Sequence, residues 1–415
     1  MIYLNTDRIY VPGAYCAAIY DLKNNVVYEI NHVGRLILDR LPLDESLNLS
    51  NDEMDYINQL LDMDILTHDY KENTSYVFEQ VPLLYVWLEL TGFCNLRCVH
   101  CYGEFGETHT NTNVLTTEQW KRIIKEISLH PTAGIQFIGG EPLAYPDFDE
   151  LLLYAYDCGI RRIDIFTNAT LLTEKTLQII RHTGASLRVS IYGHEADIHD
   201  KITGRKGSFN KLISNVNKAI SLGIPLKFAF VVMKENENYV EACLDFLRKN
   251  YSKNQAYDVI RNTSPGKKNS HYIHSNKVSL LESRYQTKPS FKTSFREFYH
   301  NHYFNSCWSG KLSITAEGDV IPCIFARQSV CGNVGNISLS EAIDLLDKEW
   351  RITKDQVEIC KDCEFRYACH DCRPTAYGIT GNYYSKHARC TYDPYTGKWN
   401  GLEKYTQEIN VEKGE

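Results

Sequence analysis

The chain has 415 residues, 43% of them hydrophobic, and its 45 basic and 52 acidic side chains give a net charge of −7. It contains no apolar run of membrane length and no charged-then-apolar leader after Met1, so we expect two or three soluble domains. No polybasic cluster stands out, which argues against binding to nucleic acid and favours a polypeptide or small-molecule partner.

The chain carries fourteen cysteines, several of them in close pairs. Without an export signal, such thiols point to a reducing cytoplasm, where they are more often metal or cluster ligands than disulfides. We therefore expect a cytoplasmic protein with bound metal.

The first 80 residues predict a small module of strands followed by helices. Residues 9–30 have the pattern of short strands separated by the turn "DLKNN", and residues 32–41 have apolar side chains at helical spacing. Ser50 stands three residues before Glu53, which is the capping-box pattern at the start of a second helix. The polar segment "THDYKENTS" then predicts a linker.

From residue 83 onward, short apolar runs alternate with helical patterns. The predicted strands are 83–90, 134–140, 161–168, 186–193, 225–233 and 257–262, and the predicted helices are 116–127, 147–158, 173–184, 209–223 and 239–250. Continuous apolar strands between helices predict a parallel sheet covered by helices, either open or closed into a barrel. Active residues are then expected at the carboxyl ends of the strands.

The last part of the chain differs in composition. Residues 265–300 are polar and basic and predict a loop-rich bridge. Beyond Cys307 the chain is rich in cysteine and has one clear helical pattern, at 338–350. This predicts a small domain held together by metal rather than by a large core.

Cys94, Cys98 and Cys101 directly follow the first predicted strand of the sheet. A structural zinc site needs four ligands, so three thiolates on one loop leave a position open unless His100 or a distant residue fills it. An iron–sulfur cluster with one iron free of protein ligands fits this loop better.

The spacing C-x3-C-x2-C, with an aromatic ring just before the third cysteine, resembles the radical S-adenosylmethionine (SAM) enzymes. The resemblance implies a partial (β/α)6 TIM-like barrel and a [4Fe–4S] cluster whose free iron binds SAM. It also implies that an electron from the cluster cleaves SAM to methionine and a 5′-deoxyadenosyl radical, which abstracts a hydrogen atom. An external electron donor such as flavodoxin or ferredoxin is expected.

The same resemblance implies which residues contact SAM. "GGEP" ends the second strand, "FTNAT" the third and "SIYG" the fourth, and "GRKGSF" supplies an arginine that would pair with the SAM carboxylate. The implied contacts are His100, Gly139, Gly140, Glu141, Pro142, Thr167, Asn168, Ser190 and Arg205. Taken alone, the glycine motif is an ordinary turn and the arginine an ordinary surface residue.

The cysteines of the tail have the spacing C-x2-C-x5-C-x2-C, which by itself is also compatible with zinc. Behind a radical SAM core it resembles the SPASM domain, which carries two auxiliary [4Fe–4S] clusters, making three clusters in all. The resemblance assigns the outer cluster to Cys360, Cys363, Cys369 and Cys390, and the inner cluster to Cys307, Cys323 and Cys372.

Two features depart from the SPASM pattern. The last gap of the cysteine run has two residues where the family usually has three, and no cysteine lies shortly before Cys307. We expect Cys331 to complete the inner cluster, with a buried unliganded thiol as the alternative. Cys16, Cys158 and Cys243 lie on apolar or helical patterns and are expected to be packing thiols.

The first module resembles the recognition element that binds the leader of a ribosomally synthesised and post-translationally modified peptide (RiPP), a winged-helix-like α+β domain. The expected domains are thus a leader-binding module at 1–80, a radical SAM core at 81–290 and an SPASM domain at 291–415. The expected function is a peptide maturase that installs a thioether or carbon–carbon cross-link in a precursor peptide.

Two alternatives stay open at this point. The first is oxidation of a Cys or Ser in a protein, as in sulfatase-maturing relatives, which carry an aspartate where this chain has Ile324. The second is a peptide-binding or electron-carrying protein without catalysis, for which the full set of implied SAM contacts is hard to explain.

Overall fold

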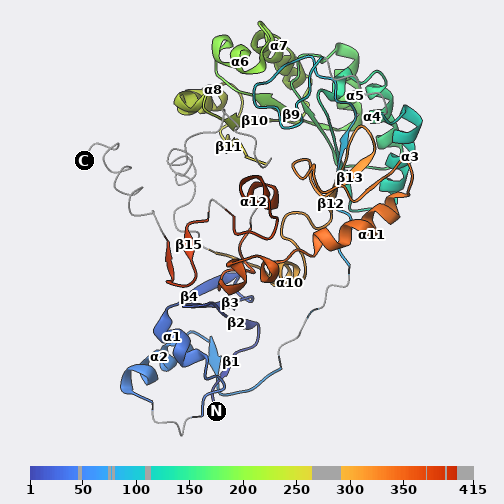
Figure 1. The fold of residues 1–415 in the computed structure, drawn as a ribbon. Helices are drawn as coiled ribbons and strands as arrows, with labels where there is room; N and C mark the ends of the chain where they lie inside the picture. Colours follow the sequence, from blue (N-terminus) through green and yellow to red (C-terminus); the bar gives the residue numbers. More distant parts are fainter. Residues whose placement is uncertain are drawn as a thin grey trace. The chain divides into compact units, whose positions relative to one another are not determined.

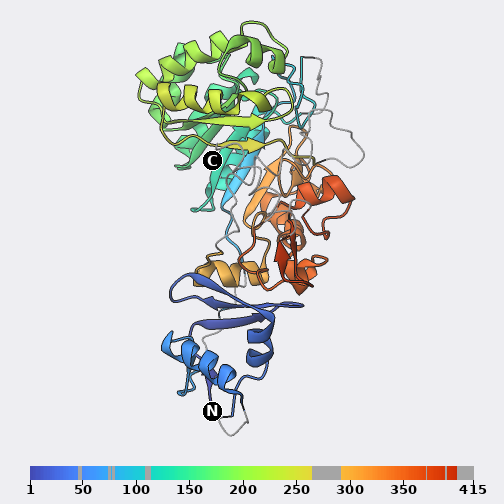
Figure 2. The same cartoon turned by 90° about the vertical axis from the view of Figure 1, so that its left-hand side faces the viewer.

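The computed structural model describes residues 1–44, 49–72, 76, 80–107, 114–263, 291–370, 372–387 and 390–399 (Figures 1 and 2). The chain forms two compact units. Unit 1 comprises residues 1–80, 282–309 and 351–415, and unit 2 comprises residues 81–281 and 310–350. These units differ from the three domain ranges expected from the sequence, and the functions assigned to those ranges remain predictions.

Unit 2 is built on a parallel sheet whose six strands pair in the order β11-β10-β9-β8-β7-β6. The strands are β6 Tyr85–Glu89, β7 Gly134–Ile138, β8 Ile163–Thr167, β9 Ser186–Ile191, β10 Leu226–Val232 and β11 Tyr257–Val259. All six fall within the predicted apolar runs. β7 is buried along its whole length, as expected for a strand with helices on its faces.

Helices connect the strands and form an outer layer around them (Figure 1). They are α3 Thr117–Ser128, η1 Pro142–Ala144, α4 Phe148–Asp157, α5 Glu174–Thr183, α6 Ala196–Thr203, α7 Ser208–Ser221, η2 Glu237–Tyr239 and α8 Val240–Asn250. Thr116 and Gln119 form a capping box that begins α3, whose apolar face includes the buried Trp120 and Ile124. The alternation of strand and helix confirms the predicted α/β core.

Residues 310–350 extend this sheet. β12 Lys311–Ile314 pairs in parallel with β6, β13 Asp319–Ile321 pairs antiparallel with β12, and β14 Gly332–Asn333 follows β13. Helix α11 Leu339–Trp350 then matches the predicted helix at 338–350. Leu312, Ser313 and Ile314 of β12 are buried, so the first part of the cysteine-rich tail is joined to the sheet by backbone hydrogen bonds and by packing.

The first module has the predicted order of strands and helices. Its elements are β1 Tyr3–Leu4, β2 Arg8–Pro12, β3 Ala17–Asp21, β4 Val26–Ile30, α1 His32–Leu38, α2 Asn51–Asp62 and β5 Leu66–Thr67. β2, β3 and β4 form an antiparallel sheet, and β1 pairs with β5. The predicted capping box of Ser50 and Glu53 begins α2. Ile19, Ile37 and Ile57 belong to one core that joins the sheet to both helices.

The second half of unit 1 packs on the other face of this sheet. Its elements are α10 Phe295–Tyr303, η3 Lys354–Gln356, η4 Cys360–Asp362, α12 Arg373–Thr380, β15 Tyr392–Asp393 and β16 Lys398–Trp399. Tyr20 lies in an apolar cluster with Phe298 and Phe365, and its hydroxyl donates to the Glu364 carbonyl at 2.8 Å. This part of the tail is therefore held together partly by an apolar core, whereas the sequence predicted a domain held together by metal.

The sequence of β3 explains why both faces of this sheet are buried. Every residue of β3 is buried, and alternate side chains point to opposite faces of a strand. The continuous apolar run "AAIY" at 17–20 thus supplies both cores. The predicted bridge at 265–300 lies outside the described residues up to position 290, and its last residues begin helix α10 instead of a loop. Within the part of the chain that is described, no helix has the length and apolar character needed to cross a bilayer.

Candidate active site

The three cysteines of residues 94–101 lie on the loop that follows β6, at the carboxyl edge of the sheet. Their side chains line one cavity with a volume of about 530 Å³. The predicted SAM contacts that line the same cavity are His100, Gly139, Gly140, Thr167, Asn168 and Ser190. The fold therefore gathers residues from four successive strand ends around one space.

The Gly139–Gly140 turn packs directly against the cysteine loop. Gly139 has φ +145°, and a Cβ there would lie 2.5 Å from the Thr91 carbonyl oxygen. A Cβ on Gly140 would lie 2.3 Å from the Phe93 carbonyl oxygen. The N–H groups of Gly140 and Glu141 donate to these two carbonyls at 2.7 and 2.9 Å. Close approach of two backbone segments therefore requires glycine at both positions.

Glu141 is buried and anchors the end of β8. Its carboxylate accepts hydrogen bonds from the Thr167 hydroxyl at 2.6 Å, the Asn168 N–H at 2.8 Å and the Leu143 N–H at 3.1 Å. Burial, partly offset by these bonds, raises the pKa of Glu141 to about 7. Glu141 is not part of the cavity wall, so it supports Thr167 and Asn168 from behind.

Asn95, which sequence reasoning did not select, ties the cysteine loop to β8. Its Oδ1 accepts a hydrogen bond from Asn168 Nδ2 at 3.0 Å, and its Nδ2 donates to Thr170 Oγ1 at 2.8 Å. Asn168 Oδ1 accepts in turn from the Thr170 N–H and hydroxyl. The only sequence signal for Asn95 is its place between two of the cysteines.

The three thiols lie in surroundings that favour a bound cation. Burial raises the pKa of Cys94 to about 12 and also raises the pKa of Cys98 and Cys101. Thiolates at this place therefore need positive charge, which the irons of a cluster would supply. The backbone N–H groups of Leu96 and Phe105 donate to the sulfurs of Cys94 and Cys101, both at 3.4 Å.

The three thiols are compatible with an iron–sulfur cluster. In a [4Fe–4S] cluster each thiolate would bind a different iron. Three thiols line the cavity, which leaves one iron of such a cluster for SAM.

An aromatic group closes the cavity beside the cysteines. The rings of His100 and Tyr192 meet edge to face with centroids 4.6 Å apart, and Tyr192 stacks with His199 at 5.6 Å. Burial lowers the pKa of His199 to about 4, so its ring is neutral and Nδ1 accepts the Tyr192 N–H at 3.3 Å. Tyr192 and His199 both line the cavity and were not predicted.

Three of the predicted SAM contacts, Glu141, Pro142 and Arg205, lie outside the cavity wall. Pro142 is the first residue of η1, where its missing N–H costs nothing. Arg205 donates to the Asn95 carbonyl at 2.6 Å and pairs with Glu107 at 3.0 Å. The structure thus shows Arg205 engaged with the cysteine loop, and its pairing with the SAM carboxylate remains a prediction.

The wall formed by β10 and β11 is mostly apolar and includes Phe228 and Phe230. Asp258 and Arg261 also line it and pair with each other at 2.5 Å. Ile324 faces the same cavity. The cavity therefore combines a thiol end with an apolar wall that holds one ion pair.

In unit 1, three of the predicted outer-cluster cysteines, Cys360, Cys363 and Cys369, lie close enough to interact electrostatically. The Cys363 N–H donates to the Cys360 carbonyl at 3.0 Å. Burial raises the pKa of Cys363, and the nearby thiols of Cys369 and Cys360 raise it further. Cys390 packs with Cys363 against the apolar cluster that contains Tyr20.

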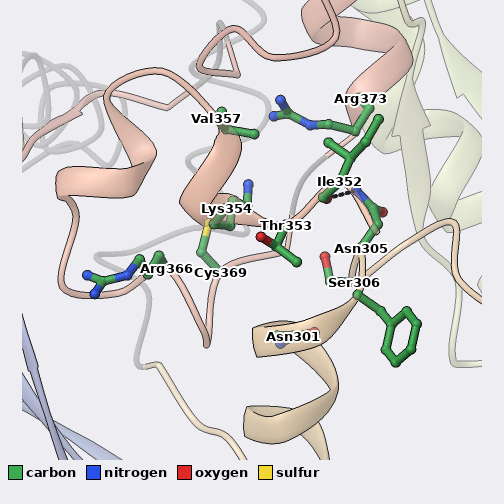
Figure 3. Close-up of a pocket in the computed structure, with 11 residues that line it drawn as sticks. Asn301, Asn305, Ser306, Ile352, Thr353, Lys354, Val357, Arg366, Cys369 and Arg373 are labelled. Atoms are coloured by element: carbon green, nitrogen blue, oxygen red, sulfur yellow. Dashed lines mark hydrogen bonds between the residues drawn. The ribbon is translucent and has the colours of Figure 1, made fainter. Parts of the chain in front are cut away.

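Cys369 also lines a small cavity of about 10 Å³ (Figure 3). Its wall includes the cationic side chains of Lys354, Arg366 and Arg373. The space is about the size of a single water molecule and is too small for an organic ligand.

The remaining predicted ligands are Cys307, Cys323, Cys331 and Cys372. The Cys307 N–H donates to Asn305 Oδ1 at 2.9 Å, and Cys372 directly precedes α12. The Cys331 thiol donates to the Ser329 carbonyl at 3.5 Å, and burial raises the pKa of Cys331 to about 11. An inner cluster bound by these residues, Cys331 included, remains a prediction.

The three cysteines expected to pack differ in depth. Cys243, on α8, is fully buried in the apolar core beside β10 and β11. Cys16 and Cys158 are half-buried. Cys243 is thus the clearest packing thiol of the three.

Comparison with known proteins identifies the family. The model of the radical SAM superfamily matches residues 88–247, and the model of SPASM, an iron–sulfur cluster-binding domain, matches residues 307–364. The chain is a radical SAM enzyme with an SPASM domain. Its cofactors are SAM and iron–sulfur clusters, as the cavity and its thiols indicated.

Individual relatives of this radical SAM/SPASM enzyme differ in what they make. An AdoMet-dependent heme synthase from Methanosarcina barkeri is 27% identical over 346 residues, covering 75% of this chain and 97% of the relative. A PqqA peptide cyclase from Bradyrhizobium diazoefficiens is 25% identical over 335 residues, covering 76% of this chain and 87% of the relative.

Among solved structures, Streptococcus suis SuiB bound to S-adenosylmethionine shares the fold. Its TM-score is 0.58 at 16% identity, covering 94% of this chain and all of SuiB. SuiB has also been solved bound to its precursor peptide SuiA, with a TM-score of 0.56 at 14% identity, covering 94% of this chain and 100% of that chain. The shared fold includes more of the chain than the radical SAM core.

Proposed function

We propose that this enzyme is a peptide maturase, which uses SAM to take a hydrogen atom from a residue of a ribosomally made precursor peptide and so installs a cross-link. The observation that carries the proposal is the single cavity of about 530 Å³, where three cysteines, the Gly139–Gly140 turn and the ends of β8 and β9 meet an apolar wall. When bound there, the cluster and SAM supply the hydrogen-abstracting radical.

The residues of the chain provide the arrangement for that chemistry. Glu141 and Asn95 fix Thr167 and Asn168 at the carboxyl edge, where SAM would bind. Phe228 and Phe230 keep the opposite wall apolar, which excludes water from a reactive intermediate. The side chains of Asp258 and Arg261 offer hydrogen-bonding groups to a peptide that enters beside them.

Three clusters are part of the proposal. Cys94, Cys98 and Cys101 hold the cluster that binds SAM. The outer auxiliary cluster takes Cys360, Cys363, Cys369 and Cys390, and the inner one takes Cys307, Cys323, Cys372 and Cys331. The auxiliary clusters collect the electron released when the new bond closes, and a flavodoxin or ferredoxin reduces the enzyme in the cytoplasm.

A peptide substrate is supported by the module at residues 1–80. Its sheet has two edge strands, β2 and β4, and an extended leader peptide can add to such an edge through main-chain hydrogen bonds. The likeness to SuiB, which binds a precursor peptide, extends over 94% of this chain. Ile324 in the cavity wall argues against oxidation of a Cys or Ser by the sulfatase-maturing route, because an isoleucine cannot act as the base.

The test is anaerobic incubation of the reconstituted enzyme with SAM, dithionite and a candidate precursor encoded beside its gene. We expect 5′-deoxyadenosine and a peptide lighter by two hydrogen atoms per cross-link. Tandem mass spectrometry then separates a thioether from a carbon–carbon bond. Formation of 5′-deoxyadenosine with every neighbouring precursor left unchanged would contradict the peptide proposal.

A second candidate is a reaction on a heme precursor. The observation that favours it is the 27% identity to a heme synthase across 97% of that relative. The same assay decides between the two, with an iron porphyrin in place of the peptide. A change in the mass of the porphyrin would support the second candidate and overturn the first.

A further inference from the structure

An ion pair with a buried carboxylate links the end of β6, where the cysteine loop begins, to the segment that follows Cys323. Glu89, the last residue of β6, is 1% exposed, and both of its oxygens accept hydrogen bonds from Arg327, at 2.9 Å from Nη1 and 3.0 Å from Nη2. This two-point contact fixes the orientation of the guanidinium group. Arg327 stands four residues after Cys323, and Glu89 stands five residues before Cys94.

The guanidinium also lies over the aromatic rings of the cysteine loop. Its carbon is 5.4 Å from the ring centre of Phe105 and 6.0 Å from that of Tyr102. Phe105 packs with Cys94 and Leu96 in one apolar cluster. Arg327 is thus held by a carboxylate and by two rings that follow the third cysteine in the chain.

The pair lies close to the cysteine loop. Arg327 lies over the ring of Phe105, and the Phe105 N–H donates to the Cys101 sulfur at 3.4 Å, so the guanidinium charge stands near that thiol. A lone cation beside an iron–sulfur cluster raises its reduction potential, because the reduced cluster is more negative. Cleavage of SAM needs a strongly reducing cluster, so an unneutralised arginine here would work against it.

We propose that Glu89 and Arg327 form a neutral clamp: Arg327 fastens the segment after Cys323 to the cysteine loop, and Glu89 cancels its charge so that the cluster of Cys94, Cys98 and Cys101 keeps a low potential. Both are positioning residues, since neither lines the cavity. The inference rests on the cluster assignment of the proposed function and not on the identity of the substrate.

The test measures the midpoint potential of the cluster whose electron paramagnetic resonance signal changes when SAM is added to the reconstituted full chain. Glu89→Gln, which keeps the shape and removes the negative charge, is expected to shift that potential upward. Adding Arg327→Met to it restores neutrality and is expected to return the potential toward the wild-type value. If Glu89→Gln has no effect, or if the double variant stays as high as the single one, the proposal is wrong.

Asp164→Asn is the matched control. Asp164 is also a buried carboxylate, 8% exposed, and pairs with a partly exposed arginine, Arg188, at 3.1 Å in the same sheet. Its variant is expected to leave the potential unchanged, and an equal shift there would overturn the proposal.

A further pair of variants covers the case in which Glu89→Gln does not assemble its clusters. Arg327→Lys, which keeps the charge, is expected to hold the wild-type potential, and Arg327→Met alone to lower it. A higher midpoint potential than wild type in either Arg327 variant would contradict the proposal. Because no peptide is present in these measurements, their failure is distinguishable from a failure of the maturase proposal.

Discussion

At the scale of single residues, Cys98 gives the most direct test of the site. It lies between the other two cysteines of the loop and packs against both the barrel core and the cluster of Phe105. We predict that Cys98→Ala abolishes formation of 5′-deoxyadenosine and retains most of the iron, since the auxiliary ligands are separate residues. Cys243→Ala, which removes a core thiol, should retain both. Wild-type product from Cys98→Ala would contradict the ligand assignment.

Glu141 gives a prediction about pH. Its pKa is raised from 4.5 to about 7 by burial, so between these values the folded chain binds more protons than the unfolded chain. The contribution of Glu141 to the free energy of unfolding is therefore complete below about pH 4.5 and is lost as the pH rises through about 7.

Glu141→Gln should remove this dependence and, by leaving one of the buried donors on Thr167 or Asn168 mispaired, cost roughly 1–3 kcal/mol. Thermal unfolding of the metal-free protein at pH 5 and pH 7.5 measures both effects. The wild type should exceed the variant in free energy of unfolding by more at pH 5 than at pH 7.5, where the difference should narrow or reverse. An equal difference at the two pH values would contradict the raised pKa of Glu141.

At the scale of elements, the turn after β7 must approach the loop after β6. Gly140→Ala places a methyl group 2.3 Å from the Phe93 carbonyl oxygen, so one segment has to move. We predict a cost of roughly 1–3 kcal/mol and loss of the SAM-dependent product, because the displaced loop carries the cysteines.

Gly106→Ala is the control within the same loop, since a Cβ there meets nothing within 4 Å. Iron content and the yield of 5′-deoxyadenosine compare the two variants. Equal yields would show that the close approach of the two backbones is not needed for function.

At the scale of the whole molecule, the first module and the second part of the cysteine-rich tail, from residue 351 onward, belong to one compact unit. Tyr20 donates to the Glu364 carbonyl and accepts the Tyr367 N–H at 3.3 Å, so two buried groups depend on its hydroxyl. Deleting residues 1–80 would therefore also uncover the apolar face of the tail. A point substitution is the cleaner probe of this contact.

We predict that Tyr20→Phe costs about 1–3 kcal/mol and makes both parts of unit 1 more sensitive to limited proteolysis together. Tyr28→Phe on the neighbouring strand serves as the control. Peptide-independent cleavage of SAM should be unchanged in both variants. Faster cleavage of the module with no change in the tail would contradict cooperative folding of unit 1.

The sequence by itself determined the chemistry and the order of the elements. The run from Cys94 to Cys101 and the alternation of apolar strands with helices were enough to predict the family and the α/β core. Such signals are local, because periodicity and ligand spacing are set within a few residues.

Only the tertiary structure decided which distant residues meet. Asn95 supports Asn168, Glu141 lies behind the cavity wall, and Glu89 pairs with Arg327 across 238 positions, and none of these contacts has a local pattern. The contact between the module and the tail was hidden for a similar reason. The continuous buried run of β3 indicates that both faces of the strand pack against a core. The residues that cover the second face lie more than 300 positions away, so only the folded chain brings Tyr20 to Glu364.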